Sequence, residues 1–133
     1  MRLNLNNISK SYNGNIAVNN VSLEILSGEI MALVGPSGCG KTTVLRMIAG
    51  LLYADSGQIL LDGQDITRLP ANKRPTVTVF QDYALFPHLN VFDNIAYGLT
   101  TRGIVKTEIL TRVKRILDIM QIKDLKNRRV HEI

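Results

Sequence analysis

The stretch GPSGCGKTT, residues 35–43, places glycines, a lysine and two hydroxyls at a spacing that suits phosphate chemistry. It fits the pattern G-x-x-x-x-G-K-[ST], with Gly35, Gly40, Lys41 and Thr42 at the fixed positions. Glycines let the backbone turn its N–H groups inward at the start of a helix, where the helix dipole favours negative charge. We expect Lys41 to reach the β- and γ-phosphates of a nucleotide, and the Thr42 hydroxyl to ligate Mg²⁺.

The sequence on both sides of this stretch favours a phosphate loop over an ordinary glycine-rich turn. Ile30 to Val34 is an apolar run after the turn Ser27-Gly28, which predicts a strand buried on both faces. Thr43 to Ala49 carries apolar residues at helical spacing, and Gly50 predicts the end of that helix. The residues predicted to bind the nucleotide phosphates are Gly35, Pro36, Ser37, Gly38, Cys39, Gly40, Lys41, Thr42 and Thr43.

The composition is that of a globular protein, with 133 residues of which 45% are hydrophobic and 20% are charged. No apolar run approaches the roughly 20 residues of a spanning helix, and the N-terminus has no apolar signal core, so we expect a cytoplasmic location. The single cysteine, Cys39, excludes an internal disulfide. The two histidines, His88 and His131, share no ligand spacing, so no metal site built from protein side chains alone is expected.

The formal net charge of +5 is concentrated in the last third of the chain. No aromatic pattern is interleaved with these charges, as an RNA-binding sheet would require, so we expect no nucleic-acid partner. We interpret most of these side chains as a solvated helix face, with an acidic partner or anionic lipid headgroups as the alternative. The basic residues are Arg102, Lys106, Arg112, Lys114, Arg115, Lys123, Lys126, Arg128 and Arg129.

The rest of the pattern predicts strands first and helices last. Alternating apolar residues in 3–8 and 21–25 predict half-buried antiparallel strands, and Gln58 to Leu61 predicts another, closed by the turn Asp62-Gly63. Val77 to Phe80 predicts a short apolar strand.

Two amphipathic helices are predicted in the last third. Asn90 is a candidate N-cap with Asp93 in the first turn, and a second helix is expected from about Thr107 to Met120. The expected apolar faces are Phe92, Ile95, Ala96 and Leu99 in the first helix, and Ile109, Val113, Ile116 and Met120 in the second.

A second informative stretch is VFQDYALFPHLNVFDNIAYGL, residues 79–99. Together with the phosphate loop and GQILLDGQDIT, residues 57–67, it resembles the ATP-binding subunit of ABC transporters, in particular importers of polyamines, ferric iron, sulfate and maltose. The resemblance covers essentially the whole chain. It implies an α/β fold of the P-loop NTPase type, as an incomplete domain. The implied parts are an antiparallel β-subdomain (1–30 and 57–67), a partial parallel nucleotide-binding core (30–50 and 77–81) and the start of a helical subdomain (90–130).

This resemblance also implies roles for two residues outside the loop. Tyr12, in SKSYNG, matches the aromatic residue that stacks on adenine; the alternative is an ordinary half-exposed strand tyrosine. Gln81 matches the glutamine that touches Mg²⁺ and the attacking water, a role that an amide fills because it both donates and accepts. The implied catalytic residues are therefore Lys41 and Gln81, and the implied Mg²⁺ ligands are Thr42 and Gln81.

The segment Asp82 to Val91 resembles the one through which such subunits meet the coupling helix of a transmembrane permease. The apolar loop Leu85-Phe86-Pro87 suits a protein interface, although Leu85 and Phe86 could instead belong to the core of the helical subdomain.

Some motifs of the family have no counterpart in this sequence: an apolar strand ending in Asp-Glu, a Ser-Gly-Gly-Gln signature and a switch histidine. Ile59 to Asp62 only superficially resembles the acidic strand end, since Gly63 makes it a turn, and Ile116 to Asp118 lies within a predicted helix. In close relatives the signature begins directly after a segment like His131-Glu132-Ile133. We therefore expect an N-terminal fragment that binds nucleotide without turning it over.

The resemblance implies ATP and Mg²⁺ as ligands, and a whole protein that couples ATP hydrolysis to solute import. Such a protein is a peripheral dimer on the inner face of the cell membrane. Its implied partners are permease subunits, a second ATPase subunit and, indirectly, a solute-binding protein. The alternatives are a non-transport ABC ATPase acting on nucleic acid or the ribosome, and a module that only binds. The family arrangement also predicts that 77–80 and 30–34 do not pair directly, because later strands separate them.

Overall fold

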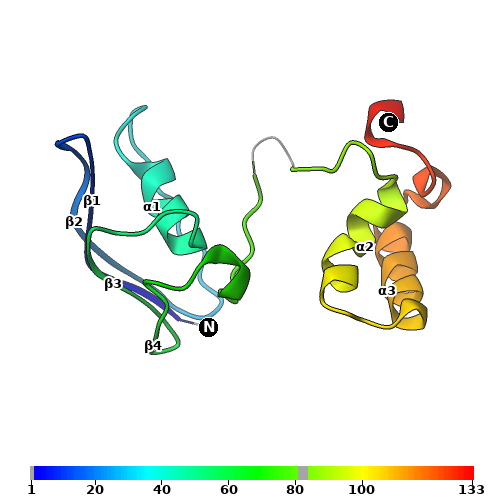
Figure 1. Ribbon diagram of the computed structural model, residues 1–133, viewed down its shortest axis with the longest axis horizontal. Coiled ribbons are helices and arrows are strands. Elements are labelled where there is room, and N and C mark those ends of the chain that lie inside the picture. The colour runs from blue at the N-terminus through cyan, green and yellow to red at the C-terminus, as the bar shows by residue number, and fades with distance from the viewer. Residues whose placement is uncertain (1, 81–83) are drawn as a thin grey trace. The chain divides into compact units, whose positions relative to one another are not determined.

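The computed structural model describes residues 2–80 and 84–133, which belong to two compact units, Met1–Thr78 and Val79–Ile133 (Figure 1). The first unit contains a sheet and one α-helix, and the second contains two α-helices. Among the described residues, no helix has both the length and the apolar character needed to cross a membrane.

The sheet of the first unit has four antiparallel strands in the order β2-β1-β3-β4. The strands are β1 (Leu3–Tyr12), β2 (Asn15–Ile25), β3 (Ser56–Leu61) and β4 (Gln64–Asp65). Asn13-Gly14 and Asp62-Gly63 form the two-residue turns, and all four residues have positive φ, which matches the twist of the flanking strands. The predicted antiparallel strands and the turn at Asp62 are confirmed.

Strand β1 is bent by irregularities in its pairing with both neighbours. Asn7, in β1, has a φ of 51°, and Gly57 lies against it at the start of β3. A Cβ on Gly57 would come 2.4 Å from the Asn7 carbonyl oxygen, so only glycine permits this approach. The irregular pairing of β1 at this point therefore depends on glycine at residue 57.

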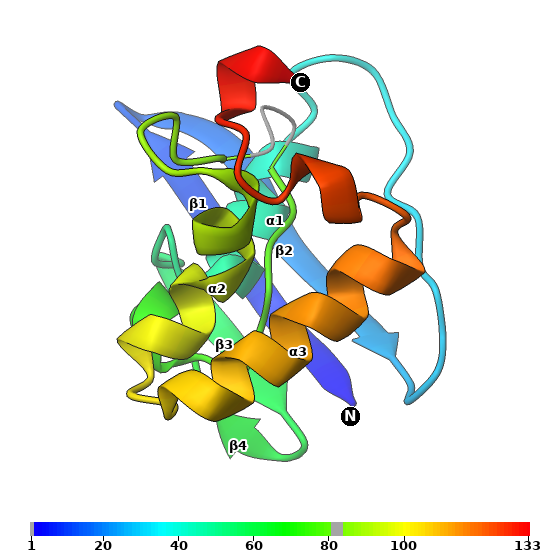
Figure 2. The same cartoon turned by 90° about the vertical axis from the view of Figure 1, so that its right-hand side faces the viewer.

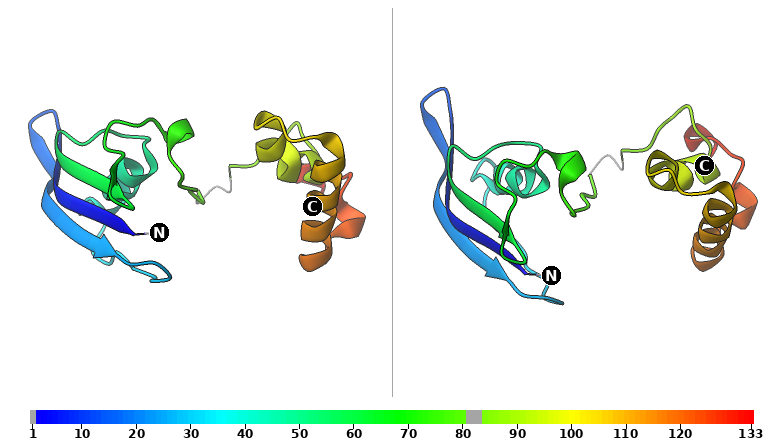
Figure 3. Two further views of the ribbon diagram at one scale, coloured as in Figure 1. Left: turned by 90° about the horizontal axis from the view of Figure 1, so that it is seen from below. Right: turned by 60° about the horizontal axis from the view of Figure 1, so that its bottom comes forward.

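Helix α1 (Lys41–Ala49) packs on one face of the curved sheet (Figure 3). Gly50 ends the helix in the left-handed conformation, with a φ of 75°, and its N–H donates to Met47 O at 3.2 Å. The predicted helix and its end are confirmed. The buried core shared by sheet and helix consists of Leu5, Ile8, Val18, Val44, Met47, Ala54, Ile59, Leu61 and Ile66.

The end of α1 is closed by a buried arginine that follows the 3₁₀ turn Ala71–Lys73. Arg74 is 6% exposed, and its guanidinium donates to carbonyl oxygens of the last turn of α1 and of the segment after β4. A cation at the carboxyl end of a helix also complements the helix dipole. Burial lowers the pKa of this guanidinium from its ordinary value. Its acceptors are Met47 O (2.6 Å), Ile48 O (2.9 Å), Thr67 O (3.0 Å) and Leu69 O (2.7 Å).

The second unit is a pair of helices, α2 (Val91–Thr101) and α3 (Lys106–Ile119), that pack side by side (Figure 2). Asn90 caps α2 as predicted, because its Oδ1 accepts a hydrogen bond from Asp93 N at 2.8 Å. The predicted apolar face of α2 is also confirmed, since all of its residues belong to the core of this unit.

The predicted apolar face of α3 is partly wrong. Ile109 and Val113 are buried, but Ile116 and Met120 are 43% and 62% exposed, and Leu117 is buried instead. The buried positions follow an i, i+4, i+8 row, because α2 covers a narrower stripe of the helix than the sequence pattern indicated.

After α3 the chain passes through two 3₁₀ turns, Lys123–Leu125 and Val130–Glu132, and returns to the start of α2. Val91 N donates to Arg128 O, and Phe92 N donates to Lys126 O, both at 2.9 Å. These two N–H groups in the first turn of α2 thus find partners outside the helix.

The two predicted core strands, Ile30 to Val34 and Val77 to Phe80, are not strands in the structure. Ile30 and Val34 are 96% and 92% exposed, and Val77 and Val79 are 90% and 89% exposed. A parallel core strand needs partners on both sides, and none of the described strands pairs with either segment. Within the first unit, Val77 and Thr78 do not pair with 30–34, as expected, but the predicted parallel core is not formed within the described residues.

Replacing Arg74 with methionine should lower the free energy of unfolding by about 2 to 4 kcal/mol, because buried carbonyl oxygens lose their donors. The Arg74→Lys variant should recover only part of this loss, since lysine keeps the positive charge but lacks the planar guanidinium with its several N–H donors. Urea denaturation followed by circular dichroism measures the change. The matched control is Lys73→Met at an exposed neighbouring position, and equal stability of the Lys73 and Arg74 variants would contradict the assignment.

The exposed apolar residues of 30–34 and 77–80 should make the chain self-associate as its concentration rises. A Val34→Lys, Val77→Lys double variant should shift sedimentation-velocity profiles toward the monomer, because charge opposes apolar contact and strand exchange. The control adds the same charge at the exposed polar residues Asn72 and Thr111. Self-association that both double variants leave unchanged would show that other surfaces are responsible.

Candidate nucleotide-binding site

The phosphate loop predicted from the sequence leads directly into α1. Gly38 and Gly40 have φ values of 81° and 91°, in the left-handed region that glycine adopts without strain. Gly40 is the N-cap of α1 and, being glycine, supplies no side-chain hydrogen bond to the first turn. The loop therefore presents backbone N–H groups at the positive end of a helix dipole, which is an arrangement that binds anions.

The position of the loop against the sheet depends on a close backbone approach between Gly40 and Ala17 of β2. A Cβ on residue 40 would lie 2.3 Å from Ala17 O and 3.3 Å from the Val18 side chain. Any other residue would have to push the start of α1 away from the sheet. Glycine is thus required at residue 40 for two reasons: the backbone has a positive φ, and a side chain would collide with the carbonyl oxygen of Ala17.

Lys41 folds back over the loop in which it stands. Its ammonium donates to Gly35 O at 2.8 Å and to Pro36 O at 2.7 Å, and lies 3.4 Å from Cys39 Sγ. The positive charge is therefore held above the same stretch of backbone that carries the glycines. A phosphate contact requires this ammonium to exchange its two carbonyl acceptors for phosphate oxygens.

A hollow of about 140 Å³ lies between the loop and β2. The Thr42 side chain in its wall is exposed, and Thr43 is half-buried. Its lining residues are Ala17, Gly38, Gly40, Lys41, Thr42 and Thr43. Uncapped N–H groups, an ammonium and two hydroxyls around one hollow fit a polyphosphate, and the hydroxyl of Thr42 is a hard oxygen donor of the kind Mg²⁺ prefers. Among the described residues, no group of three or more His, Cys, Asp or Glu side chains could hold a metal ion by itself.

Tyr12, at the end of β1, has 44% of its surface exposed. The Lys10 ammonium lies 5.9 Å from the centroid of its ring, within the range of a cation–π contact. Lys10 in turn pairs with Asp55, whose carboxylate also accepts a hydrogen bond from Ser11 N. The hydrogen bond from Lys10, followed by that from Ser11, lowers the pKa of Asp55 from its usual value.

Gln81, the other predicted catalytic residue, lies outside the described residues, as do the first two residues of the predicted permease segment. From Ala84 onward the segment belongs to the second unit. The structure thus brings the loop residues together at the start of α1, next to Ala17 of β2. The contribution of Gln81 stays a prediction.

The loop before α2 has a mixed exposure. Leu85 is 51% exposed, whereas Phe86 is half-buried, with its ring 4.2 Å from the ring of Tyr97. Asn94 fixes the backbone of this loop, because its side-chain amide accepts from Phe86 N at 2.9 Å and donates to Phe86 O at 3.1 Å. Phe86 thus packs partly against its own unit, Leu85 is not part of that core, and the contact of this loop with a permease stays a prediction.

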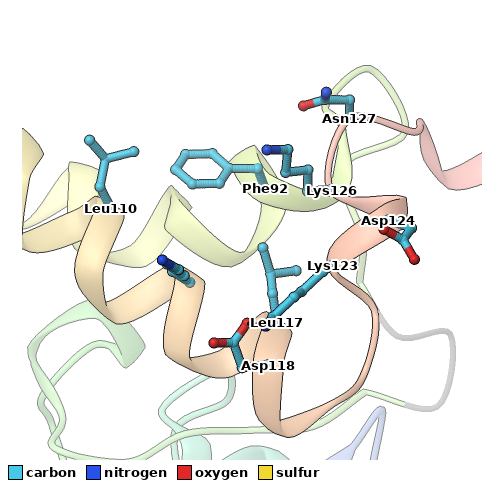
Figure 4. Close-up of a pocket in the computed structure, with 9 residues that line it drawn as sticks. Phe92, Leu110, Leu117, Asp118, Lys123, Asp124, Lys126 and Asn127 are labelled. Atoms are coloured by element: carbon cyan, nitrogen blue, oxygen red, sulfur yellow. Dashed lines mark ion pairs between the residues drawn. The ribbon is translucent and has the colours of Figure 1, made fainter.

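A larger hollow, of about 770 Å³, lies on the second unit and contains none of the predicted site residues (Figure 4). Phe92 from α2 and Leu110 from α3 lie at it, and Lys123 pairs with Asp118 at 2.9 Å. Its lining residues are Phe92, Leu110, Lys114, Leu117, Asp118, Lys123, Asp124, Lys126 and Asn127. All of the basic residues singled out in the last third are exposed, which agrees with a solvated face.

Sequence analysis missed Ala17, Lys10 and Asp55 as residues that shape the site. Ala17 acts through its carbonyl oxygen, which has no sequence signature. Lys10 and Asp55 are far apart in the chain and meet only because β1 pairs with β3.

Comparison with known proteins agrees with this geometry. The ABC transporter family model matches residues 18–133. The spermidine/putrescine import ATP-binding protein PotA of Vibrio cholerae is 48% identical over 131 residues, which is 98% of this chain and 35% of that protein. PotA of Protochlamydia amoebophila is 56% identical over 117 residues, covering 88% of this chain and 31% of that protein. The chain thus spans about a third of the length of these relatives.

Solved structures give the same result. An ATP-binding cassette of an ABC transporter matches with a TM-score of 0.82 and 26% identity, over 98% of this chain and 58% of that one. A dimeric ATP-binding cassette in a post-hydrolysis state, bound to ADP and Pi, matches with a TM-score of 0.83 and 26% identity, over 98% of this chain and 62% of that one. The family match, the relatives and the fold lead to one conclusion: the chain belongs to the ABC transporter family.

Proposed function

We propose that this chain binds Mg-ATP, with the phosphates on the loop Gly35–Thr43 and the adenine against Tyr12. The observation that carries the proposal is the loop itself, where Gly38 and Gly40 turn the backbone at an uncapped helix start. Lys41 is already held above this backbone and needs only to exchange carbonyl oxygens for phosphate oxygens. Tyr12 offers an exposed aromatic surface for a purine.

The proposed Mg²⁺ ligands are Thr42 and Gln81, and the proposed catalytic residues are Lys41 and Gln81. A Mg²⁺ ion held by these residues would supply positive charge that offsets the negative charge of the nucleotide phosphates. The exposed hydroxyl of Thr42, next to Lys41 at the start of α1, supports the first ligand. The role of Gln81 is proposed only because the sequence around it matches the family motif.

In the whole protein to which this sequence belongs, ATP hydrolysis drives import of a polyamine across the membrane. The proposal is supported by relatives at 48% and 56% identity that carry the name spermidine/putrescine import ATP-binding protein. The whole protein is proposed to act as a dimer on the inner face of the cell membrane. A solute-binding protein is proposed to deliver the polyamine to the permease.

We assign residues 1–30 and 57–67 to a β-subdomain, 30–50 and 77–81 to the nucleotide-binding core, and 90–130 to a helical subdomain. The permease contacts the helical subdomain through Asp82 to Val91. Exposed Leu85 supports this contact, and the bonds of Asn94 to Phe86 support a loop of defined shape.

Replacing Lys41 with alanine should weaken Mg-ATP binding by about 1.5 to 3 kcal/mol, the range of a hydrogen bond to a charged group. The lower part of the range is favoured, because the ammonium gives up its bonds to Gly35 O and Pro36 O on binding. Isothermal titration calorimetry measures the change, with Lys73→Ala as the control for loss of one exposed positive charge. An unchanged affinity in the Lys41 variant would refute the phosphate-loop assignment.

The proposed substrate is tested in cells that lack their own polyamine-import ATPase. The whole protein should restore uptake of radiolabelled spermidine, and its Lys41→Ala variant, expressed to the same level, should not, because ATP drives the transport step. Uptake of maltose and sulfate in matching deletion strains is the control for solute specificity. Restored maltose or sulfate uptake without spermidine uptake would assign the protein to another solute.

A further inference from the structure

Lys10 and Asp55 form a network beside Tyr12 that the proposed function does not yet use. The Asp55 carboxylate accepts from Lys10 Nζ at 2.5 Å and from Ser11 N at 2.8 Å. The Asp55 backbone N–H donates to Ser9 O at 2.9 Å. Three hydrogen bonds thus join Asp55, which precedes β3, to residues 9–11 near the end of β1.

The lysine of this pair is less exposed than the basic partner of the other ion pair on the sheet, whereas the carboxylate is open to solvent. The Lys10 side chain is 16% exposed and that of Asp55 is 47% exposed. For comparison, the ion pair of Arg2 and Glu24 on the same sheet has side chains that are 58% and 40% exposed. Partial burial of the lysine restricts its side chain to few conformations.

The fixed ammonium lies 5.9 Å from the centroid of the Tyr12 ring. At that distance the positive charge is attracted to the ring face, which favours one orientation of the tyrosine. Tyr12 as a whole is 44% exposed, so surface remains available for a further aromatic contact.

The anchored end of β1 lies close to the phosphate loop through β2. Ala17 stands between Ile16 and Val18, which pair with Ser11 and Lys10 of β1. The carbonyl oxygen of Ala17 is the atom that approaches Gly40. The β1–β2 hairpin and the loop into α1 both stand at the upper end of the unit in Figures 1 and 2.

We propose that Lys10 and Asp55 are positioning residues that orient Tyr12 to stack on the purine base of the bound nucleotide. This inference rests on the proposed nucleotide site. It adds the interaction that orients the Tyr12 ring before the nucleotide binds. A ring that is oriented before binding loses less rotamer freedom when the base arrives. The pair should therefore contribute to the affinity for ATP and not to the affinity for inorganic tripolyphosphate, which has no base.

The experiment measures the affinities of ATP and of inorganic tripolyphosphate, each with Mg²⁺, by calorimetry. Asp55→Asn and Lys10→Met should each weaken ATP binding about two- to tenfold, the range expected for an aromatic contact, and leave tripolyphosphate binding unchanged. Tyr12→Leu should do the same, and adding Asp55→Asn to it should cause little further loss, because the network acts through the ring. Glu24→Gln, which breaks the other ion pair on this sheet, should change neither affinity.

The possible results separate this inference from the function on which it rests. If the Asp55 and Lys10 variants bind ATP as the parent does, or lose affinity for both ligands equally, the positioning role is wrong. If Tyr12→Leu binds ATP normally, the base does not stack on Tyr12, and the inference falls with that assignment. If the parent chain binds neither ligand, the proposed nucleotide site itself is wrong. Additive losses in the Tyr12, Asp55 double variant would show that the pair acts independently of the ring.

Discussion

The approach of Gly40 to the carbonyl oxygen of Ala17 is the constraint on which the site depends. It places the start of α1 against β2 at a distance that no side chain at residue 40 would permit. From that point the helix runs so that Val44 and Met47 enter the core of the sheet, and the backbone of Gly38 and Gly40 turns toward the hollow that they share with Lys41. The core of the unit and the proposed anion site thus both depend on one backbone contact. Arg74 holds the opposite end of the same helix through its last carbonyl oxygens.

Elements whose causes are local were predictable from the sequence. The turn at Asp62-Gly63 follows from residues that accept positive φ, the helix end at Gly50 from the left-handed conformation, and the start of α2 from the hydrogen bond between Asn90 and Asp93. The loop residues Gly38, Gly40 and Lys41 were also predictable, because their spacing reflects the chemistry of a phosphate. In each case the residues that form the sequence pattern and the structural feature that they predict are only a few positions apart in the chain.

Elements whose causes are distant were not predictable. Ile30 to Val34 is as apolar as a core strand, yet a strand exists only when neighbours supply hydrogen bonds, and none of the described strands does so. The error at Ile116 has a related origin, because burial on α3 depends on how much of it α2 covers. Ala17 and Asp55 could not be recognised either, since their roles arise from strand pairing and close approach.

The central claim is that the backbone at the start of α1 binds the phosphates of a nucleotide. Amide chemical shifts of the ¹⁵N-labelled chain, recorded while Mg-ATP is added, test it most directly. The account predicts that the largest changes occur at the N–H groups of Gly38, Gly40, Lys41 and Thr42, with smaller changes near Tyr12. Changes concentrated at the hollow around Phe92 and Lys123, with the loop amides unaffected, would contradict it.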